Sequence, residues 1–250
     1  MSRRPTRTRI HTHTVESRPT TAAADVPQLL RLLHLASPAL PIGAFHFSQG
    51  LEYAVDAGWI RDEAGALEWI GGVAAASLAT LDLPVLQRLH AAWVANDDAA
   101  VRRWNAFLLA SRETRELRAE DKHLGAALMR VLAELELATD TFPARPAHEH
   151  DGLAHATAFA FACARWNIPA LDALRTYGWA WAENQVLAAV KLVPLGQSAG
   201  QRMLHSLGAR LGALTAQAAG FRDSDIGVAS MRQGIASARH EVQYTRLFRS

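Results

Sequence analysis

Residues 37–52 read SPALPIGAFHFSQGLE, and they interrupt a chain whose pattern is otherwise helical. Two prolines and two glycines restrict the backbone of this segment, because proline fixes φ and glycine permits positive φ. The segment is apolar, unlike a solvated loop, so we expect it to pack on the body of the protein or on another molecule. From the sequence, Phe45, His46 and Phe47 face the core, a second copy or a partner.

The composition is typical of a helical globular protein. Half of the 250 residues are hydrophobic and only 7% are aromatic, while alanine, leucine and arginine are abundant, which favours helices. The single cysteine, Cys163, excludes an internal disulfide framework and is expected to be an inert core thiol in a reducing cytoplasm. No uncharged run reaches the roughly 18 residues that span a bilayer, and no signal-peptide pattern is present. We therefore expect a cytoplasmic protein without a membrane partner.

The formal net charge of +2 conceals a basic N-terminal extension. Five arginines and a single glutamate lie within residues 1–20, so the rest of the chain is slightly acidic. Residues 1–25 show no periodicity and are predicted to be a disordered tail. Because the excess positive charge belongs to this tail, the body of the protein is not expected to bind nucleic acid.

Helical periodicity from residue 26 onward predicts one all-α, bundle-like domain over residues 26–250, with about ten helices. The expected helices cover residues 26–36, 48–57, 62–81, 82–94, 96–108, 112–137, 153–166, 169–193, 197–219 and 226–241. The first of these is expected to be well buried, and Asp82-Leu83-Pro84 is expected to start a new helix. The helix at 169–193 is apolar on several faces, so we expect it to be central.

Two polar patterns stand out within these helices. Residues 111–122 are dense in charge, and they form either a solvated face with pairs such as Arg112–Glu116 and Arg118–Asp121 or a face for a partner. In the central helix, Tyr177, Asn184 and Lys191 recur every seven residues. Buried polar groups need hydrogen-bond partners, so we expect bonds to irregular backbone such as residues 38–43. The alternative is that they line a cavity.

Enzymatic activity is not expected from the residue patterns. The glycine-containing turn at residues 194–200 lacks the Lys-Ser/Thr of a phosphate-binding loop, and no nucleophile elbow is present. Glu183, Lys191 and His240 remain as acid–base candidates if the protein is an enzyme after all.

A metal site is the other chemical alternative. His148, Glu149, His150 and His155 offer imidazole and carboxylate ligands that suit nickel or zinc. However, adjacent and alternate ligands on a loop do not form the helical HExxH arrangement. No resident metal or cofactor is therefore expected, and a nickel carrier that uses this segment is the alternative function.

The end of the sequence is the strongest candidate for protein binding. Residues 240–250 read HEVQYTRLFRS and combine tyrosine, phenylalanine and arginine. These residue types are enriched at the energetic centres of protein interfaces. An interaction protein is therefore favoured over an enzyme.

Four segments carry a resemblance to a known family. They are residues 37–52, ASRETRELRAED at 110–121, AENQVLAAVKLVPLGQSAGQRML at 182–204, and HEVQYTRLFRS at 240–250. They look like the urease accessory protein UreF family, in the same order along the chain, over about residues 28–250.

The resemblance implies a non-catalytic, cytoplasmic, all-helical maturation factor that forms a homodimer. Members of the family bind the accessory protein UreD, also called UreH, and recruit and regulate the GTPase UreG on apo-urease. The complex delivers nickel to the urease active site, so nickel is its cargo, and no cofactor of this chain is implied.

The resemblance also assigns residues to partner binding. In the family the final segment becomes ordered when UreD/UreH binds, which carries over onto Arg239, His240, Tyr244, Arg246, Leu247, Phe248, Arg249 and Ser250. The family loop carries over onto Pro41, Gly43, Phe45, Phe47, Ser48, Gln49, Gly50 and Glu52. The segment that faces the GTPase or lines a nickel tunnel carries over onto Lys191, Gln197, Ser198 and Gln201. Many members have tyrosine at the position of Phe47, so we expect the packing of this ring without a hydroxyl hydrogen bond.

Overall fold

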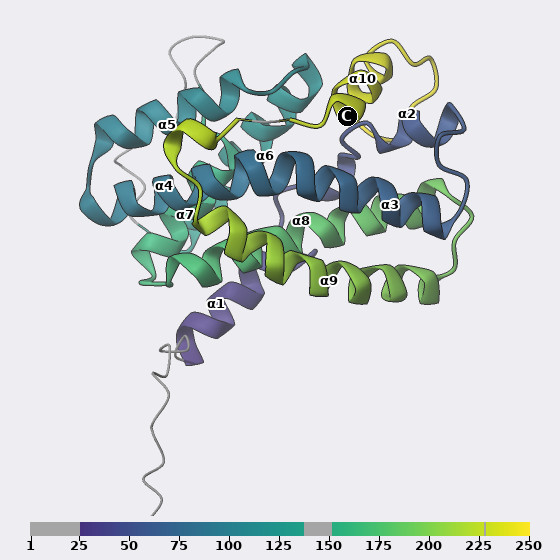
Figure 1. Ribbon diagram of the computed structural model, residues 1–250. Coiled ribbons are helices and arrows are strands. Elements are labelled where there is room, and N and C mark those ends of the chain that lie inside the picture. The colour runs from purple at the N-terminus through teal and green to yellow at the C-terminus, as the bar shows by residue number, and fades with distance from the viewer. Residues whose placement is uncertain (1–25, 138–151, 228) are drawn as a thin grey trace, which may run out of the picture.

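The structure is a computed structural model, and it describes residues 26–137, 152–227 and 229–250. Within these ranges it contains helices and no strand (Figure 1), which confirms the predicted all-α fold. The α-helices are α1 (Val26–Ala36), α2 (Leu51–Asp56), α3 (Glu63–Val73), α4 (Leu83–Ala95), α5 (Asp98–Ala110), α6 (Arg115–Glu134), α7 (His155–Arg165), α8 (Ala170–Leu192), α9 (Gln197–Ala219) and α10 (Met231–His240). Short 3₁₀ turns lie at Ala44–His46 and Asp223–Asp225. The arginine-rich residues 1–25 and the histidines at 148 and 150 lie outside the described residues.

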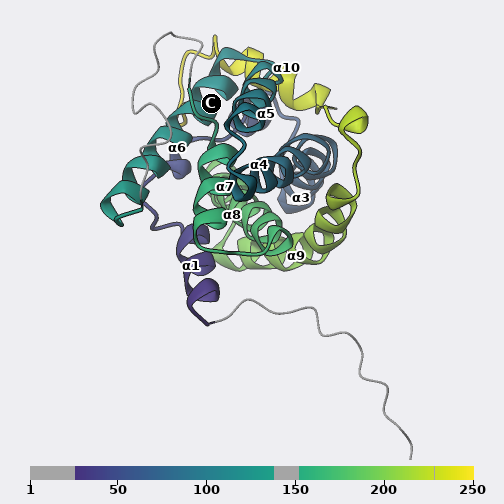
Figure 2. The ribbon, with the colours of Figure 1, turned by 90° about the vertical axis from the view of Figure 1, so that its left-hand side faces the viewer.

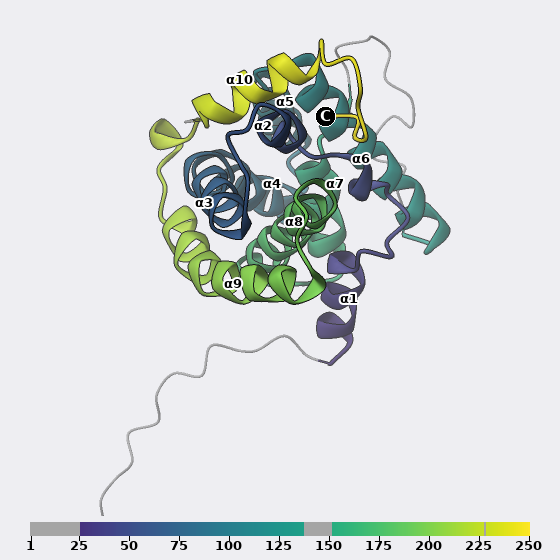
Figure 3. The same cartoon turned by 90° about the vertical axis from the view of Figure 1, so that its right-hand side faces the viewer.

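Helix α8 occupies the centre of the molecule, as the sequence predicts. It packs against α9 along its length and also against α1, α2, α4 and α7 (Figures 2 and 3). The alanine-rich α7 is buried on nearly all sides between α4 and α6. Its small side chains allow these close approaches, and Phe159 and Phe161 fill the remaining core volume.

The expected break at Asp82 is wrong, because the helix continues without interruption from Glu63 to Ala95. A stretch of π-helix over Ala74–Asp82 joins α3 to α4, and it precedes Pro84, which has no N–H to donate. The carbonyl of Thr80 instead accepts a hydrogen bond from the backbone N–H of Gly227 at 3.2 Å. This helix is long and apolar enough to cross a membrane, but 72% of its apolar window is buried inside the protein.

Helix α1 is much less buried than its sequence predicts. Only Leu32 and Leu35 are buried, on the side that packs on α8. The other large apolar side chains are exposed, at 71% for Val26, 50% for Leu29, 60% for Leu30 and 59% for Leu33. The leucines surround this helix, and one neighbouring helix covers only one side of it, so α1 projects from the body (Figure 1).

Two helices begin later than expected because the backbone before them turns. Gln49 and Gly50 have φ of 56° and 83°, so α2 begins at Leu51 and not at Ser48. Gly227 has φ of 124°, and Ser230 caps α10 by accepting from the N–H of Gln233 at 3.4 Å. Elsewhere Asp97 caps α5 by accepting from the N–H of Ala100 at 2.9 Å.

Two helical glycines give a matched test of the packing between α6 and α7. A Cβ on Gly125 would lie 1.9 Å from the carbonyl oxygen of Leu153, whereas a Cβ on Gly72 would meet nothing within 4 Å. We expect Gly125→Ala to lower the free energy of unfolding by about 2 kcal/mol or more through overpacking. Gly72→Ala, the control, should raise it by about 0.5 kcal/mol or more because alanine favours helix. Urea unfolding followed by circular dichroism measures both, and equal effects would contradict the close approach.

Candidate protein-docking site

The charge-dense segment before and within α6 is not a solvated face. Glu116, Glu120 and Asp121 are buried. The expected local pairs Arg112–Glu116 and Arg118–Asp121 do not form. Arg112 lies before α6 and bonds Asp82 and Asp121, while Arg118 donates to the carbonyls of Leu109 and Arg112. The buried face of this helix therefore carries acids, and each acid has a partner from elsewhere in the chain.

The sequence did hold a signal for these buried acids. Leu117, Glu120, Asp121, Leu124 and Leu128 follow the spacing i, i+3, i+4, i+7 and i+11, so the acids share the face of the buried leucines. Glu116 and Glu120 are nevertheless absent from the residues assigned to the site from the sequence. Charge density alone suggests a solvated face, so it does not indicate that these acids lie on the buried side of the helix.

Arg112 joins the π-helical stretch to α6. Its guanidinium lies 2.5 Å from a carboxylate oxygen of Asp82 and 2.8 Å from one of Asp121. Burial raises the pKa of Asp82, and the charge of Arg112 opposes this shift. Asp121 also accepts from the backbone N–H of His155 at 2.7 Å. The Arg112 guanidinium thus pairs with both buried carboxylates, and the N–H of His155 supplies a further donor to Asp121.

The interrupting segment 37–52 packs on this charged face. The side-chain amide of Gln49 donates to Glu120 at 2.8 Å, and its carbonyl oxygen accepts from Trp181 at 2.9 Å. Asn184 donates to the carbonyl of Phe47 at 3.2 Å. The expectation that the polar stripe of α8 bonds irregular backbone is thus confirmed for Asn184, although at Phe47 and not at residues 38–43.

The aromatic residues of this segment divide between core and surface. Phe47 is buried at 4% exposure, and its ring centroid lies 5.7 Å from that of His123. Phe45 is 49% exposed, and His46 is exposed as well. The carbonyl of His46 accepts from the backbone N–H of Arg249 at 2.8 Å. The Phe47 ring is thus packed without a hydroxyl hydrogen bond, as expected for phenylalanine in place of tyrosine.

A cavity lies between this segment, α6 and α8. It has a volume of about 110 Å³, and its lining includes Asn184, Tyr177 and Gln49 beside apolar side chains of residues 35–45. Burial raises the pKa of Tyr177 well above its ordinary value. Both sequence-based alternatives for the polar stripe thus hold in part, because Asn184 bonds backbone and also lines the cavity.

The final residues of the chain bind back onto the protein (Figure 3). We call residues 245–250 the strap. The two oxygens of Glu52 accept from the backbone N–H groups of Leu247 at 2.6 Å and Phe248 at 2.9 Å. Arg246 donates to Glu116 at 2.8 Å. Backbone and side chain of the strap are thus held by two buried carboxylates.

The last residue of the strap enters the same charged region. The hydroxyl of Ser250 donates to Glu120 at 2.7 Å, and its carbonyl oxygen accepts from the backbone N–H of Ser48 at 2.8 Å and from the Ser48 hydroxyl. Burial raises the pKa of Glu120 to about 7, although hydrogen bonds from Gln49 and Ser250 oppose this shift. Glu120 therefore links the interrupting segment to the strap.

Lys191 brings three predicted site residues together. Its ammonium lies 5.7 Å from the centre of the Phe45 ring and 5.8 Å from that of Phe248. Cations in such positions are attracted to the aromatic face. The end of α8, the segment 37–52 and the strap thus meet at one place on the surface.

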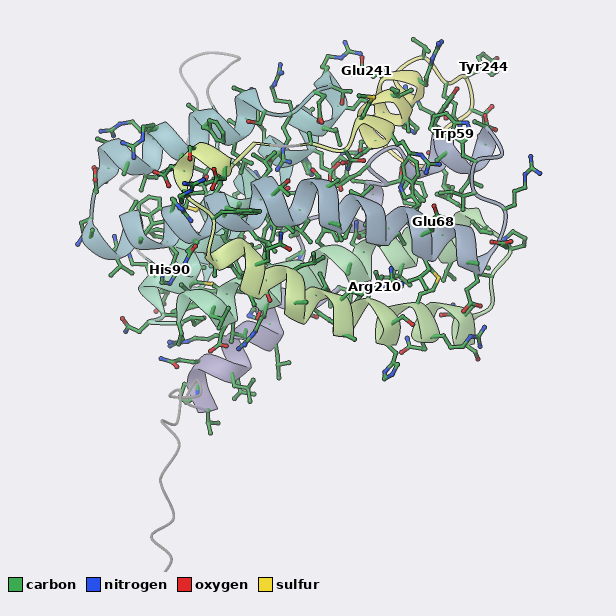
Figure 4. The ribbon with its side chains drawn as sticks, in the orientation of Figure 1. Trp59, Glu68, His90, Arg210, Glu241 and Tyr244 are labelled. Carbon is green, nitrogen blue, oxygen red and sulfur yellow. The ribbon has the colours of Figure 1, made fainter. Side chains whose placement is uncertain are left out.

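The structure divides the predicted partner-binding residues into two groups. Arg239, Tyr244, Arg246, Leu247 and Arg249 are exposed, with Tyr244 wholly so at 103% (Figure 4). Gln197, Ser198 and Gln201 are exposed in the first turns of α9. By contrast, Phe47, Glu52, His240, Phe248 and Ser250 are buried. Phe45 and Lys191 are exposed as well, and Gln49 is half-buried, so contact of the predicted residues with a partner stays a prediction.

Within the described residues the chemical alternatives gain no support, and the part of the metal alternative at His148, Glu149 and His150 lies outside them. No group of three or more His, Cys, Asp or Glu side chains within the described residues could hold a metal ion. The pKa of His155 is lowered to about 4 by burial, and the pKa of Cys163 is raised by burial. Glu183 lines the cavity, whereas Lys191 contacts two aromatic rings and His240 contacts two carboxylates, so these acid–base candidates do not meet.

Comparisons with known proteins give a consistent result. The family model UreF matches residues 60–208. A urease accessory protein UreF from Azoarcus sp. (strain BH72) is 51% identical over 236 residues, which cover 92% of this chain and 99% of that protein. One from Alkalilimnicola ehrlichii is 47% identical over 88% of this chain and 95% of that protein. A bifunctional urease accessory protein UreEF from Bordetella bronchiseptica is 46% identical over 92% of this chain and 54% of that protein.

The shifted pKa of Glu120 predicts a pH-dependent stability. The pKa of Glu120 is about 7 in the folded state against a reference of 4.5. The protonated carboxyl therefore contributes to the free energy of unfolding below the reference pKa, and this contribution is lost as pH rises through 7. Between about pH 4.5 and pH 8 it amounts to on the order of 3 kcal/mol. Glu120→Gln gives a side chain that stays uncharged at every pH, so it should remove this part of the loss of stability with rising pH. Urea unfolding at several pH values measures the effect. Glu68→Gln, on the exposed side of α3 (Figure 4), should keep it, and a wild-type profile in Glu120→Gln would contradict the assignment.

Proposed function

The chain belongs to the UreF family of urease accessory proteins, and from that premise we propose that it is a non-catalytic scaffold for nickel insertion. Its general role is urease maturation. In the finer proposal it binds UreD/UreH, and the pair recruits and regulates the GTPase UreG on apo-urease. The observation that carries this proposal is a strap held by buried carboxylates, with the exposed Leu247 on it and the exposed Tyr244 directly before it.

The exposed face of α10 and the strap has the composition of a protein interface. Met231 and Ile235, one turn apart on α10, are 80% and 48% exposed. Val242, Tyr244 and Leu247 follow the helix at 78%, 103% and 66% exposure. Large apolar side chains exposed in such number within one short segment suit an interaction site. Exposed arginines at 239, 246 and 249 flank it, and both arginine and tyrosine are frequent interface anchors.

The backing of the strap favours tight binding. Residues 246–248 lie on Glu52 and Glu116, and Ser250 lies on Glu120. The strap is docked in the isolated chain, which differs from the ordering on binding that the resemblance implies. A segment that is already ordered loses less conformational entropy when a partner binds. We assign this surface to UreD/UreH, because it contains the part of the chain that resembles the family's partner-binding segment.

A second surface at the same end of the molecule suits UreG. Lys191 and the exposed polar residues Gln197, Ser198 and Gln201 lie where α8 passes into α9. Figure 1 shows the start of α9 and α10 at this end, on opposite sides of α3. Two partners on these surfaces approach from different sides. This arrangement supports a three-protein complex with nickel as its cargo.

The Bordetella relative adds support from its name, since it is called a bifunctional UreEF protein. An association of this kind of chain with other urease accessory proteins is what the scaffold role requires. Homodimer formation is part of the proposal as well, and the exposed apolar side of α1 is the surface that we assign to it. A second copy of α1 would cover the leucines that α8 leaves exposed.

Truncation of the exposed anchors tests the first interface. We expect Tyr244→Ala and Leu247→Ala each to weaken UreD/UreH binding by about 2 kcal/mol, roughly 30-fold, through loss of apolar contact. Both side chains are exposed, so the melting temperature should stay unchanged. Isothermal titration with purified UreD/UreH measures the affinity, and Val94→Ala, 61% exposed on α4, is the control. Wild-type affinity in both tail variants, or no recruitment of UreG by the complex, would overturn the proposal.

A charge on the exposed side of α1 tests the dimer. Leu30→Glu places a carboxylate within the proposed contact, where an unpaired buried charge is costly. We expect light scattering after size exclusion to give twice the chain mass of 27.2 kDa for the wild type and a single chain mass for the variant. Val94→Glu adds the same charge elsewhere and should remain dimeric. A Leu30→Glu variant that stays dimeric would exclude this face.

A further inference from the structure

His240 is a buried titratable group to which the proposed scaffold role assigns no chemistry. It is the last residue of α10, its side chain is 0% exposed, and each ring nitrogen faces a carboxylate. Nδ1 lies 2.7 Å from Glu116 and Nε2 lies 3.0 Å from Glu52. A neutral imidazole has one N–H and one lone pair, so it would turn that lone pair toward one of these acids. An imidazolium donates to both, which is the arrangement that the two distances fit.

The charges around this ring come from every element packed against it. Glu52 belongs to α2, Glu116 to α6 and Arg246 to the strap, and together with a protonated His240 they sum to zero. Glu241 lies at the rim, where it accepts from the backbone N–H of Glu116 at 3.3 Å and faces Arg115 at 3.9 Å. Loss of the imidazolium proton leaves a net negative charge beneath the strap, which is costly in a buried site.

The carboxylates that hold the ring are the ones that hold the strap. Glu52 contacts His240 and also accepts from the N–H groups of Leu247 and Phe248. Glu116 contacts His240 through one oxygen and Arg246 through the other. A change in the charge or position of His240 therefore reaches the strap through one intervening side chain.

We infer that His240 is a positioning residue whose imidazolium form keeps the strap docked, so that loss of its proton releases the strap. The protonated ring favours the docked form, because only the imidazolium donates to both Glu116 and Glu52. Since Leu247 lies on the docked strap and Tyr244 directly precedes it, the consequence for partner affinity rests on the proposed function. The positioning itself does not depend on which partner binds.

Strap mobility in the full chain tests this inference without a partner. Cys163 is 0% exposed, so a nitroxide reacts selectively with a Thr245→Cys variant, whose site is exposed. Spectra between about pH 5.5 and pH 9.5 bracket the ordinary titration of histidine. We expect the ratio of mobile to immobile label to rise about tenfold or more with pH, because loss of one member of a buried charge group is strongly destabilising.

Two histidine variants separate positioning from a general effect of pH. In the labelled chain, His240→Gln should give a mobile strap at every pH, because an amide supplies no positive charge to the two acids. His205→Gln, exposed on α9, should keep the wild-type profile. Nitrogen-15 NMR of the histidine rings should show both nitrogens of His240 protonated at the low-pH end. Circular dichroism reports whether each variant is folded.

The outcomes are distinguishable. A wild-type label mobility that does not change with pH, or a His240 ring with one unprotonated nitrogen at low pH, overturns the inference. An immobile strap in folded His240→Gln overturns it too. If that variant does not fold, the wild-type pH profile and the NMR result decide alone. Failure of UreD/UreH binding with a normal mobility profile would count against the proposed function only.

Discussion

Acidic side chains that leave water need a positive charge or hydrogen-bond donors, and this requirement connects α6 to the rest of the protein. Each buried acid of α6 bonds a different part of the chain. Glu116 holds His240 and Arg246, Glu120 holds Gln49 and Ser250, and Asp121 holds Arg112. The interrupting segment, α10 and the strap are therefore placed by the same helix. Apolar contact alone would leave these irregular segments with far less definite positions.

This arrangement gives the molecule a stable body and a surface fit for association. The apolar core under α8 needs no partner, and its helices are held by close packing of alanine, leucine and phenylalanine. The strap and α10 are different, since they are held largely through polar bonds and present apolar side chains outward. Hydrogen-bonded carboxylates thus hold the strap without using its outward side chain Leu247. The supporting body is therefore distinct from the surface that we propose for docking.

Local sequence was sufficient for most helices and for the general kind of function. The periodicity of residues 197–219 and 170–192 predicts α9 and α8 almost to the residue, because burial against one core repeats every 3.6 residues. Asp97 predicts a helix start because its side chain caps an N–H only three residues away. The absence of catalytic patterns and the tyrosine, phenylalanine and arginine near the end indicated protein binding. Each inference used chemistry contained within a short segment, or a family resemblance carried by such segments.

Tertiary structure alone decided which polar residues are buried, which helix face stays exposed and what each charge meets. Residues 111–122 read equally well as a solvated face, and five leucines in α1 suggested burial that a single neighbour does not provide. Asp82 looked like a helix start until its carboxylate was seen to bond Arg112 from within a continuous helix. His240 and Glu52 are 188 residues apart in sequence and 3.0 Å apart in space. The sequence by itself determined the helices and the class of protein, because periodicity and caps act within a few residues. The pairing of the charges depends on contacts between distant segments, which local patterns do not encode.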